Sequence, residues 1–395
     1  MNRSKRRHAE YFAALAQAAE SQGDAGGNDE TAAALELEYP NLRAALSWAT
    51  DAREYALAIA LTSAMDALWL ARNQVREGRS WVDRVLAFGE AIPPEHRVKL
   101  HRTNMRLRYF EGESRAMEES AREAVVLYRD LGDLAGLGQA QNGLAVALHA
   151  RGALDEAETT FQECLELQRA IGNKRDLAYT LGNLGTLAIE SRGDYAKAGE
   201  IFRECLQLSA DLGDRESEAV ALSNLATAEW YLGDVERAID FCARSLKLAR
   251  ELEMDALLAS GLIVLARLEL HRGNLHESVQ ALKKGLAVAR RTHDFAQVAL
   301  AMETFSRIAL RVSRFSDGVA LLAFAKRYRE VHGADQPAVA AAETRELESA
   351  FRKALDGATF ARQSAAGARA TIAASLQIAH ALLGDGKRRA GGVKG

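Results

Sequence analysis

Five glycines recur along the middle of the chain at an almost constant interval. Gly112, Gly152, Gly193, Gly233 and Gly273 are 40, 41, 40 and 40 residues apart. Each stands between two runs whose apolar residues follow helical spacing, and glycine can take the positive φ at which a helix ends. The interval therefore predicts one helical hairpin per period, in a stack of hairpins. A stack of this kind presents surface to a partner and has no built-in reaction centre.

Leucines and small residues repeat in register with the glycines. A framework leucine stands eight residues before the glycine, or nine in the copy that ends at Gly193, so we expect a slightly longer helix or turn there. A small residue follows the glycine by five positions, where it lets two antiparallel helices approach to the usual roughly 8–10 Å. The framework leucines are Leu144, Leu184, Leu225 and Leu265, and the small residues are Ala157, Ala198, Ala238 and Ser278.

The pattern continues beyond the regular copies. Upstream, Gly78 takes the position of the small residue, and downstream Ser313 stands where the next glycine would be. We count about seven helix pairs between residues 55 and 335, which exceeds the roughly three that a stable stack needs. The predicted fold class is all-α.

The best-kept copies allow a family to be named. They resemble the tetratricopeptide repeat in its longer form, as found in kinesin light chain and in bacterial signalling regulators. The resemblance implies a right-handed superhelical solenoid with helical caps at both ends. It rests on Asn183-Leu184-Gly185, Gly193-Asp194-Tyr195, Ala198, Phe202, Asn224-Leu225-Ala226, Gly233-Asp234 and Ala238.

The two ends of the chain extend the resemblance. Two predicted helices, 8–21 and 31–50, are joined by a segment rich in Gly, Ser and Asp. They are similar to the joining segment of MalT-like and LuxR-type regulators, and residues 338–383 are similar to the helical cap of the same proteins. We therefore predict a joining segment (1–54), a repeat array (55–335), a C-terminal helical cap (336–386) and a disordered basic tail (387–395).

The other activities of that family lack their motifs in this sequence. Such regulators carry an ATPase module and a DNA-binding helix-turn-helix. A phosphate-binding loop needs G-x-x-x-x-G-K-[ST], whereas Gly386-Lys387 is followed by arginine. What the resemblance implies for this chain is the sensing of a ligand or partner.

Charge and hydropathy exclude further classes of partner. The formal net charge is −3 and the pI is about 6.4, so no general nucleic-acid surface is expected; basic residues cluster at 3–7 and 387–389, where solvated tails are the simpler interpretation. No apolar run approaches the roughly 18 residues of a membrane span, and the N-terminus has no cleavage site. We expect a cytoplasmic protein without a membrane partner.

The chain offers no recognisable catalytic or metal site. His271 and His276 flank a repeat turn without H-E-x-x-H order, and no G-x-S-x-G motif occurs. Cys164, Cys205 and Cys242 occupy packing positions of the repeats, so we expect buried thiols rather than a disulfide framework or metal ligands. The predicted protein is not an enzyme and needs no cofactor. Trp48, Trp69 and Trp81 are expected in the core of the N-terminal region.

The resemblance also indicates where a partner would bind. In tetratricopeptide arrays the first helix of each pair lines the concave face, at positions two and six after the framework leucine. We hypothesise an anion-binding pocket for a peptide carboxylate or an acidic or phosphorylated segment, because arginine suits bidentate contacts and aromatic rings give anchoring area. Its residues are Arg267, His271, Arg307, Arg311, Trp230 and Tyr231. In the alternative interpretation, these arginines pair with local glutamates such as Glu269 and Glu303.

Asn183 and Asn224 share one first-helix position, directly before the framework leucine. Either a bond to the neighbouring helix or a ligand contact explains them.

Two hypotheses of function follow. The first is a non-enzymatic scaffold that binds a peptide or protein segment in its groove. The second is the detached sensor half of an ATP-dependent transcription regulator, which reads a small inducer or governs an ATPase or transcription-regulator module on another chain. An enzyme with an unrecognised site is the remaining and weakest alternative.

Overall fold

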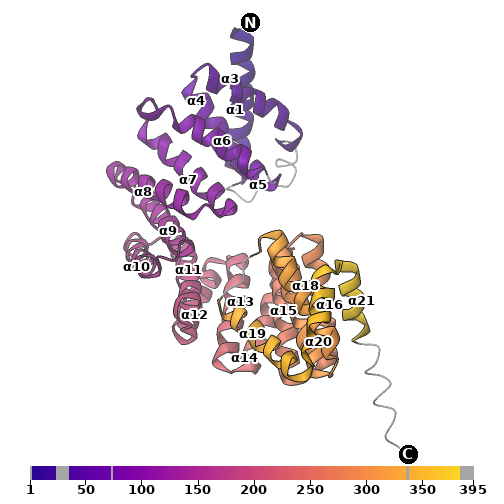
Figure 1. The fold of residues 1–395 in the computed structure, drawn as a ribbon. Coiled ribbons are helices and arrows are strands. Elements are labelled where there is room, and N and C mark those ends of the chain that lie inside the picture. Colours follow the sequence, from indigo (N-terminus) through magenta and orange to yellow (C-terminus); the bar gives the residue numbers. More distant parts are fainter. Residues whose placement is uncertain (1, 24–34, 73, 335–337, 383–395) are drawn as a thin grey trace, which may run out of the picture. The chain divides into compact units, whose positions relative to one another are not determined.

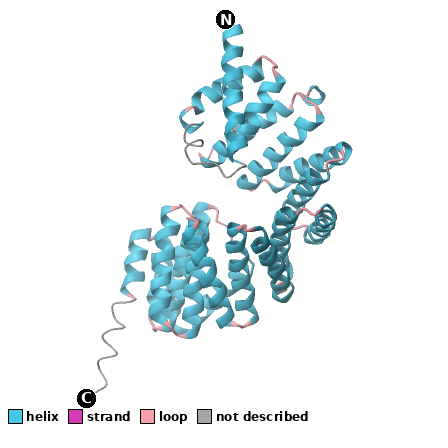
Figure 2. Ribbon diagram, turned by 180° about the vertical axis from the view of Figure 1, so that it is seen from behind, coloured by secondary structure: helices cyan, strands magenta, loops and turns pink. Residues whose placement is uncertain are grey.

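The protein is built from helices throughout the part of the chain that its structure describes, and no strand occurs there. The structure is a computed structural model that describes residues 2–23, 35–72, 74–334 and 338–382 (Figures 1 and 2). The chain divides into two compact units, residues 1–180 and 181–395, and each is described by itself. The predicted all-α fold class is confirmed.

Unit 1 begins with helices that cap the repeats. Helix α1 packs on α3 and α4, and helix pairs follow. The elements are α1 (Asn2–Gly23), α3 (Tyr39–Asp51), α4 (Tyr55–Ala64), α5 (Asp66–Ala71), α6 (Val75–Leu86), the 3-10 helix η1 (Gly89–Ala91), α7 (Pro94–Glu111), α8 (Ser114–Leu131), α9 (Leu134–Ala150) and α10 (Leu154–Ile171).

Unit 2 continues the pairs and ends with three further helices. Helix α11 (Lys174–Arg192) begins in unit 1 and crosses the boundary. The elements that follow are α12 (Tyr195–Leu212), α13 (Arg215–Leu232), α14 (Val235–Glu251), α15 (Asp255–Arg272), α16 (Leu275–Arg291), α17 (Phe295–Arg311), α18 (Phe315–His332), α19 (Ala338–Ala354), α20 (Gly357–Arg369) and α21 (Ile372–Ala381). From α4 to α18 the described helices form seven pairs, as the period predicts; α4 and α5 together make the first member of the first pair.

Positive φ marks the turns within the pairs. All five glycines of the sequence ladder adopt it, from +62° at Gly193 to +89° at Gly233, and so does Ser313 at +60°. The turn geometry thus persists where glycine is lost. A second, unpredicted series of positive φ lies between successive pairs, at Gly132, Gly172, Gly213, Glu253 and His293, and Gly333 has positive φ directly after the last pair.

Small residues allow close packing where the sequence places them. A Cβ added to Gly185 would lie 2.4 Å from Cε1 of Phe202, and one added to Gly78 would lie 2.5 Å from Cδ2 of Trp69. Phe202 and Trp69 are fully buried, and Trp81 is also buried. Trp48 is half-buried and packs against the same N-terminal core.

The three cysteines lie buried in packing positions, as expected. Cys164 donates to the carbonyl of Gly138 and Cys242 to that of Gly261, at Sγ to O distances of 3.1 and 3.3 Å. Burial raises the pKa of Cys164 to about 11 and that of Cys242 to about 12. Both groups therefore stay thiols at neutral pH, which suits packing and not nucleophilic chemistry.

The ends differ in detail from the predicted elements. Helix α1 is longer than the predicted 8–21. The start of the predicted helix 31–50 lies outside the described residues; residues 35–37 are helical, and α3 begins at Tyr39. Most of the predicted linker, the boundary at 335–336 and the basic tail 387–395 lie outside the described residues.

Helices α20 and α21 cover the last helix pair. Helix α20 crosses α18 so closely that a Cβ added to Gly367 would lie 2.1 Å from the carbonyl oxygen of Ala320. Ala379 and Leu382, at the end of α21 and directly after it, join the core cluster of α17 and α18. Helix α19 is anchored differently: its Leu347 and Phe351 are buried with residues of α18 and α20, and its other end lies over first helices of the repeats.

Candidate functional site

One carboxylate connects three successive first helices of unit 2 with α19. Oε2 of Glu343 accepts hydrogen bonds from Nη2 of Arg267, at 2.5 Å, and Nη2 of Arg307, at 3.0 Å. Its Oε1 accepts one from the hydroxyl of Tyr231, at 3.1 Å. Tyr231 comes from α13, Arg267 from α15 and Arg307 from α17. We call these four residues the Glu343 site and the surface formed by α13, α15 and α17 the first-helix face.

The repeat period explains why these side chains converge. Arg267 and Arg307 are 40 residues apart and occupy the same position on α15 and α17, two residues after Leu265 and Phe305. Tyr231 follows Leu225 by six residues, one helical turn further along α13. Stacked first helices therefore present the three side chains to one point, although they are far apart in sequence.

Aromatic rings hold the arginine in place. The guanidinium carbon of Arg267 lies 4.2 Å from the ring centroid of Trp230. The Tyr231 ring stacks on Trp230 at 5.7 Å and on Tyr195 at 4.5 Å between centroids. Arg267 thus lies between a π face and a carboxylate, which is a favourable place for a cation.

The site places two cations against a single carboxylate. Burial lowers the pKa of Arg307, and the nearby Arg267 lowers it further. Burial, followed by the negative charge of Glu343, raises the pKa of Tyr231 to about 12. The side chains of Arg267, Arg307 and Glu343 are 11%, 28% and 22% exposed, so their charges are only partly screened by water. The arrangement is suited to holding an anion.

The carboxylate that both arginines share comes from far along the chain. Glu303 accepts a hydrogen bond from Nε of Arg329 at 3.1 Å, and Glu269 accepts one from Nδ2 of Asn274 at 2.7 Å. The sequence points to these two local glutamates and not to Glu343, which is 36 residues from Arg307 and 76 from Arg267. No spacing signal could have found it, because α19 lies outside the repeat period.

The other predicted site residues lie apart from Glu343. His271 and Arg311 are exposed near the ends of α15 and α17, and neither has an ion-pair partner among the described residues. Asn183 on α11 and Asn224 on α13 are partly buried. The structure therefore brings Trp230, Tyr231, Arg267 and Arg307 together, while the roles of the remaining four stay predictions.

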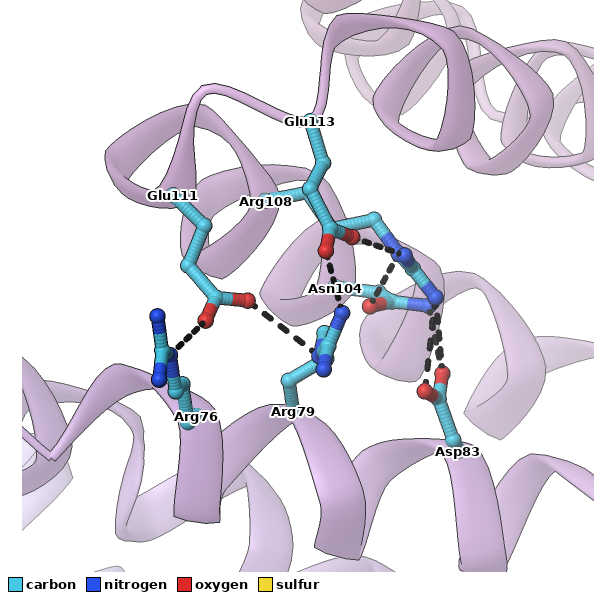
Figure 3. Close-up of polar contacts among 7 residues, drawn as sticks. All are labelled: Arg76, Arg79, Asp83, Asn104, Arg108, Glu111 and Glu113. Carbon is cyan, nitrogen blue, oxygen red and sulfur yellow. Dashed lines mark hydrogen bonds and ion pairs between the residues drawn. The ribbon is translucent and has the colours of Figure 1, made fainter.

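Unit 1 contains a different cluster of charges, shown in Figure 3. Arg108 of α7 donates to Asn104, to Glu113 and to both oxygens of Asp83, at 2.7–3.3 Å. Arg79 of α6 contacts Glu113 at 2.5 Å and Glu111 at 3.2 Å. Arg76 reaches Glu111 at 3.5 Å. We call these seven residues the α6–α7 network; its three arginines face three carboxylates.

No group of three or more His, Cys, Asp or Glu side chains among the described residues could hold a metal ion.

None of the described helices combines the length and the apolar character needed to span a bilayer.

The helical repeat belongs to a known family. The family model for the MalT-like TPR region matches residues 98–326, which is more than half of the chain. The chain belongs to the MalT-like tetratricopeptide family. Its match covers α8 to α17 completely and contains Tyr231, Arg267 and Arg307.

Curated relatives of this MalT-like chain are larger regulators. A candidate HTH-type transcriptional regulator of Mycobacterium tuberculosis is 28% identical over 185 residues, and a protein of the same description from Mycobacterium bovis matches equally. The match covers 44% of this chain and 20% of each relative. The chain thus spans about a fifth of the length of these proteins.

Solved structures of similar fold include peptide-linked and ATPase-linked repeat proteins. The quorum sensor NprR from B. thuringiensis has a TM-score of 0.55 at 14% identity and covers 83% of this chain and 87% of its own. The Rap conjugation gene regulator of plasmid pLS20, solved with the Phr* peptide, has a TM-score of 0.52 at 15% identity, and the match covers 82% of this chain and 80% of the regulator. A signal-transduction ATPase with a tetratricopeptide sensor from Pyrococcus horikoshii has a TM-score of 0.52 at 13% identity, and the match covers 83% of this chain and 46% of the ATPase. These likenesses show the tetratricopeptide fold.

Proposed function

We propose that this protein is a non-enzymatic scaffold that binds a peptide or protein segment on the first-helix face of unit 2, in bacterial signalling or regulation. The observation that carries the proposal is the Glu343 site, in which side chains from three successive repeats bind one carboxylate supplied by a crossing segment. A surface that holds one helix of its own chain in this way has the chemistry to hold a segment of another.

Two further observations support this proposal. Trp230, Tyr231 and Arg267 are of the residue types that dominate binding energy at protein interfaces, and they adjoin one another here. Among the proteins of similar fold, the Rap regulator was solved with a peptide. The partner would be recognised by its charge and by its aromatic or apolar neighbours, without a cofactor.

The test begins with the untagged protein isolated from its native cells, together with whatever peptide or protein accompanies it. The partner is identified by mass spectrometry, and its affinity for purified chains is then measured. We expect the double variant Arg267→Gln, Arg307→Gln to lose at least about tenfold in affinity, because two charge-assisted contacts disappear. The matched double variant Arg76→Gln, Arg79→Gln in unit 1 should bind as the wild type does. Equal affinity of all three chains would refute the proposed site.

A second function is favoured by the family and its relatives. In this alternative the repeats are the sensor of an ATP-dependent transcription regulator, reading a small inducer or governing an ATPase or DNA-binding module. The observation behind it is that the curated relatives carry the name of HTH-type regulators and are about five times longer than the matched region. Recovery of a small molecule instead of a peptide, or of an ATPase whose activity the chain alters, would favour this alternative.

A further inference from the structure

The Glu343 site already contains an occupant, and that occupant belongs to the chain. Arg267, Arg307 and Tyr231 belong to the repeat array, whereas Glu343 is carried by a helix outside it. Among the described residues, Glu343 is the carboxylate that both guanidinium groups contact by hydrogen bonds. Its two oxygens make the contacts that the carboxylate of an acidic side chain from a partner would make.

The two halves of α19 are held by different forces. In the second half, Leu347 is 4% exposed and Phe351 is fully buried, and a Cβ added to Gly318 would lie 2.3 Å from Cζ of Phe351. Arg352 also lies 4.0 Å over the ring of Phe360. Burial of these two apolar side chains stabilises their contact with α18 and α20, so this half is firmly anchored.

The first half of α19 has little apolar surface to bury. Its residues 340–342 are alanines that remain partly exposed, and an alanine offers one methyl group. Thr344 is 4% exposed, and its hydroxyl donates to the carbonyl of Ala340 at 2.9 Å. Glu343 makes the hydrogen bonds that join this half to α13, α15 and α17.

Electrostatics favour exchange of this carboxylate for another. Two cations share one anion; burial lowers the pKa of Arg307, and the nearby Arg267 lowers it further. A partner with several carboxylates neutralises both cations better than one glutamate can, and it can reach the exposed Arg311 on the same helix. Glu343 is tethered to the chain and so is present at high effective concentration. The apparent affinity for such a partner is the intrinsic affinity multiplied by the fraction of time that the site is free of Glu343.

We propose that Glu343 on α19 is an intramolecular substitute for the ligand of the first-helix face, and that an acidic peptide segment displaces it. The first half of α19 then leaves the face while Leu347 and Phe351 keep the second half in place. The array thus has an autoinhibited state, in which Glu343 occupies the site, and a bound state, in which a partner's carboxylates do. This inference rests on the proposed function, of which it specifies the ligand chemistry and the control.

The test uses the full chain with a fluorescent hexaglutamate peptide as probe and hexaglutamine as its neutral match. Glu343→Gln keeps the shape of the side chain and removes its charge. We expect this variant to bind hexaglutamate about tenfold more tightly than the wild type, which corresponds to a site that is free about a tenth of the time. Neither chain should bind hexaglutamine. Adding Arg267→Gln to Glu343→Gln should abolish the gain.

A matched control lies on the same helix. Glu348 pairs with Lys326 and Arg352, away from the Glu343 site. Glu348→Gln also removes one carboxylate from α19 but leaves Glu343 in the Glu343 site. The affinity for hexaglutamate should therefore stay at the wild-type value. An equal gain in both variants would show a general charge effect and overturn the proposal.

Hydrogen exchange gives an independent readout of the displacement. Amides of residues 340–346 should exchange faster in Glu343→Gln, and in the wild type saturated with hexaglutamate, while amides of α20 stay protected. Unchanged affinity and protection in Glu343→Gln would overturn the autoinhibited state. If hexaglutamate binding to the wild type still depended on Arg267 in that case, the proposed function would stand without it.

Discussion

The α6–α7 network and the Glu343 site are both clusters of arginines and carboxylates, but they differ in how the charges are supplied. The network joins neighbouring helices, all its residues lie between 76 and 113, and its three arginines face three carboxylates. The Glu343 site joins α13, α15 and α17 with α19, and two arginines share one carboxylate.

This difference separates structural charges from exchangeable ones. In the network each cation finds its partner on a helix or turn of a neighbouring helix pair, so its ion pairs join segments that already pack together. In the Glu343 site the anion belongs to a helix whose first half, at residues 340–342, buries only alanine side chains and those in part. An ion pair of this second kind can be opened by a competing ligand without disturbing the repeats.

The largest expected effect is a contrast in binding. Arg267→Glu, made in the Glu343→Gln chain so that the site is open, should weaken hexaglutamate binding by more than about 100-fold, because repulsion replaces attraction at a partly buried position. Arg79→Glu reverses the same charge in the network and should leave binding within about twofold. Fluorescence anisotropy measures both; similar losses in the two variants would end the distinction between the clusters.

The second test disturbs the anchor of α19 and leaves every charge intact. Gly318→Ala puts a methyl group 2.3 Å from Cζ of Phe351, and such overpacking costs about 1–3 kcal/mol. We expect faster amide exchange along α19 and tighter hexaglutamate binding. Gly182→Ala on α11 is the control, since its added Cβ would have no packing neighbour within 4 Å beyond the local backbone of its own helix; a helical Gly to Ala change there should stabilise by about 0.5–1 kcal/mol. If the amides of α19 exchanged as slowly in Gly318→Ala as in the wild type, the packing of Phe351 against Gly318 would not be what anchors the helix.

The third test compares stability. Arg108→Ala removes the hydrogen bonds to Asp83, Asn104 and Glu113 and should lower the free energy of unfolding by about 1–2 kcal/mol, given that Asp83 and Glu113 are partly exposed. Glu343→Gln should cost less than about 1 kcal/mol, because α19 keeps its apolar anchor. Urea unfolding monitored by circular dichroism measures both; the reverse order would show that Glu343 is the more structural of the two.

The smallest expected effect is a difference in pH dependence. A hydrogen bond from Arg79 lowers the pKa of Glu113 below its ordinary 4.5, so its stabilisation is present above that pH and is lost as the pH falls. The pKa of Tyr231, raised to about 12 from 10.0, acts oppositely: its stabilisation is present below pH 10 and is lost as the pH rises to about 12. The pKa of Tyr231 is measured from phenolate absorbance, and Tyr231→Phe identifies its contribution. In Glu343→Gln this pKa should be lower than in the wild type but still above 10, because burial is the larger cause of the shift. An unchanged pKa of Tyr231 in Glu343→Gln would contradict the hydrogen bond between Tyr231 and Glu343.

The regular features of the fold were predictable because they repeat. The interval between Gly112 and Gly273 predicted the hairpins, and the small residues predicted close packing of the kind seen at Gly185. The turn at Ser313 was harder, because a positive φ can be kept by a residue other than glycine when the flanking helices impose it. For the same reason Glu253 and His293 hid the second series of turns.

The site was predictable only in part. Position within the repeat placed Arg267 and Arg307 on one face, since equivalent positions of stacked helices are neighbours. Trp230 and Tyr231 were added for their residue types, and they do adjoin Arg267. His271 and Arg311 follow the same logic but lie near helix ends, where the structure leaves them exposed.

The sequence by itself determined the repeat, because periodic packing leaves a periodic record in the chain. Only the tertiary structure decided which carboxylate meets the two arginines. The path of α19 depends on Phe351 fitting against Gly318 and on the helices that follow it, and none of these contacts has a period. From the sequence, either a ligand or a local glutamate would pair with the two arginines; in the structure Glu343, far along the chain, takes the position that a ligand would need.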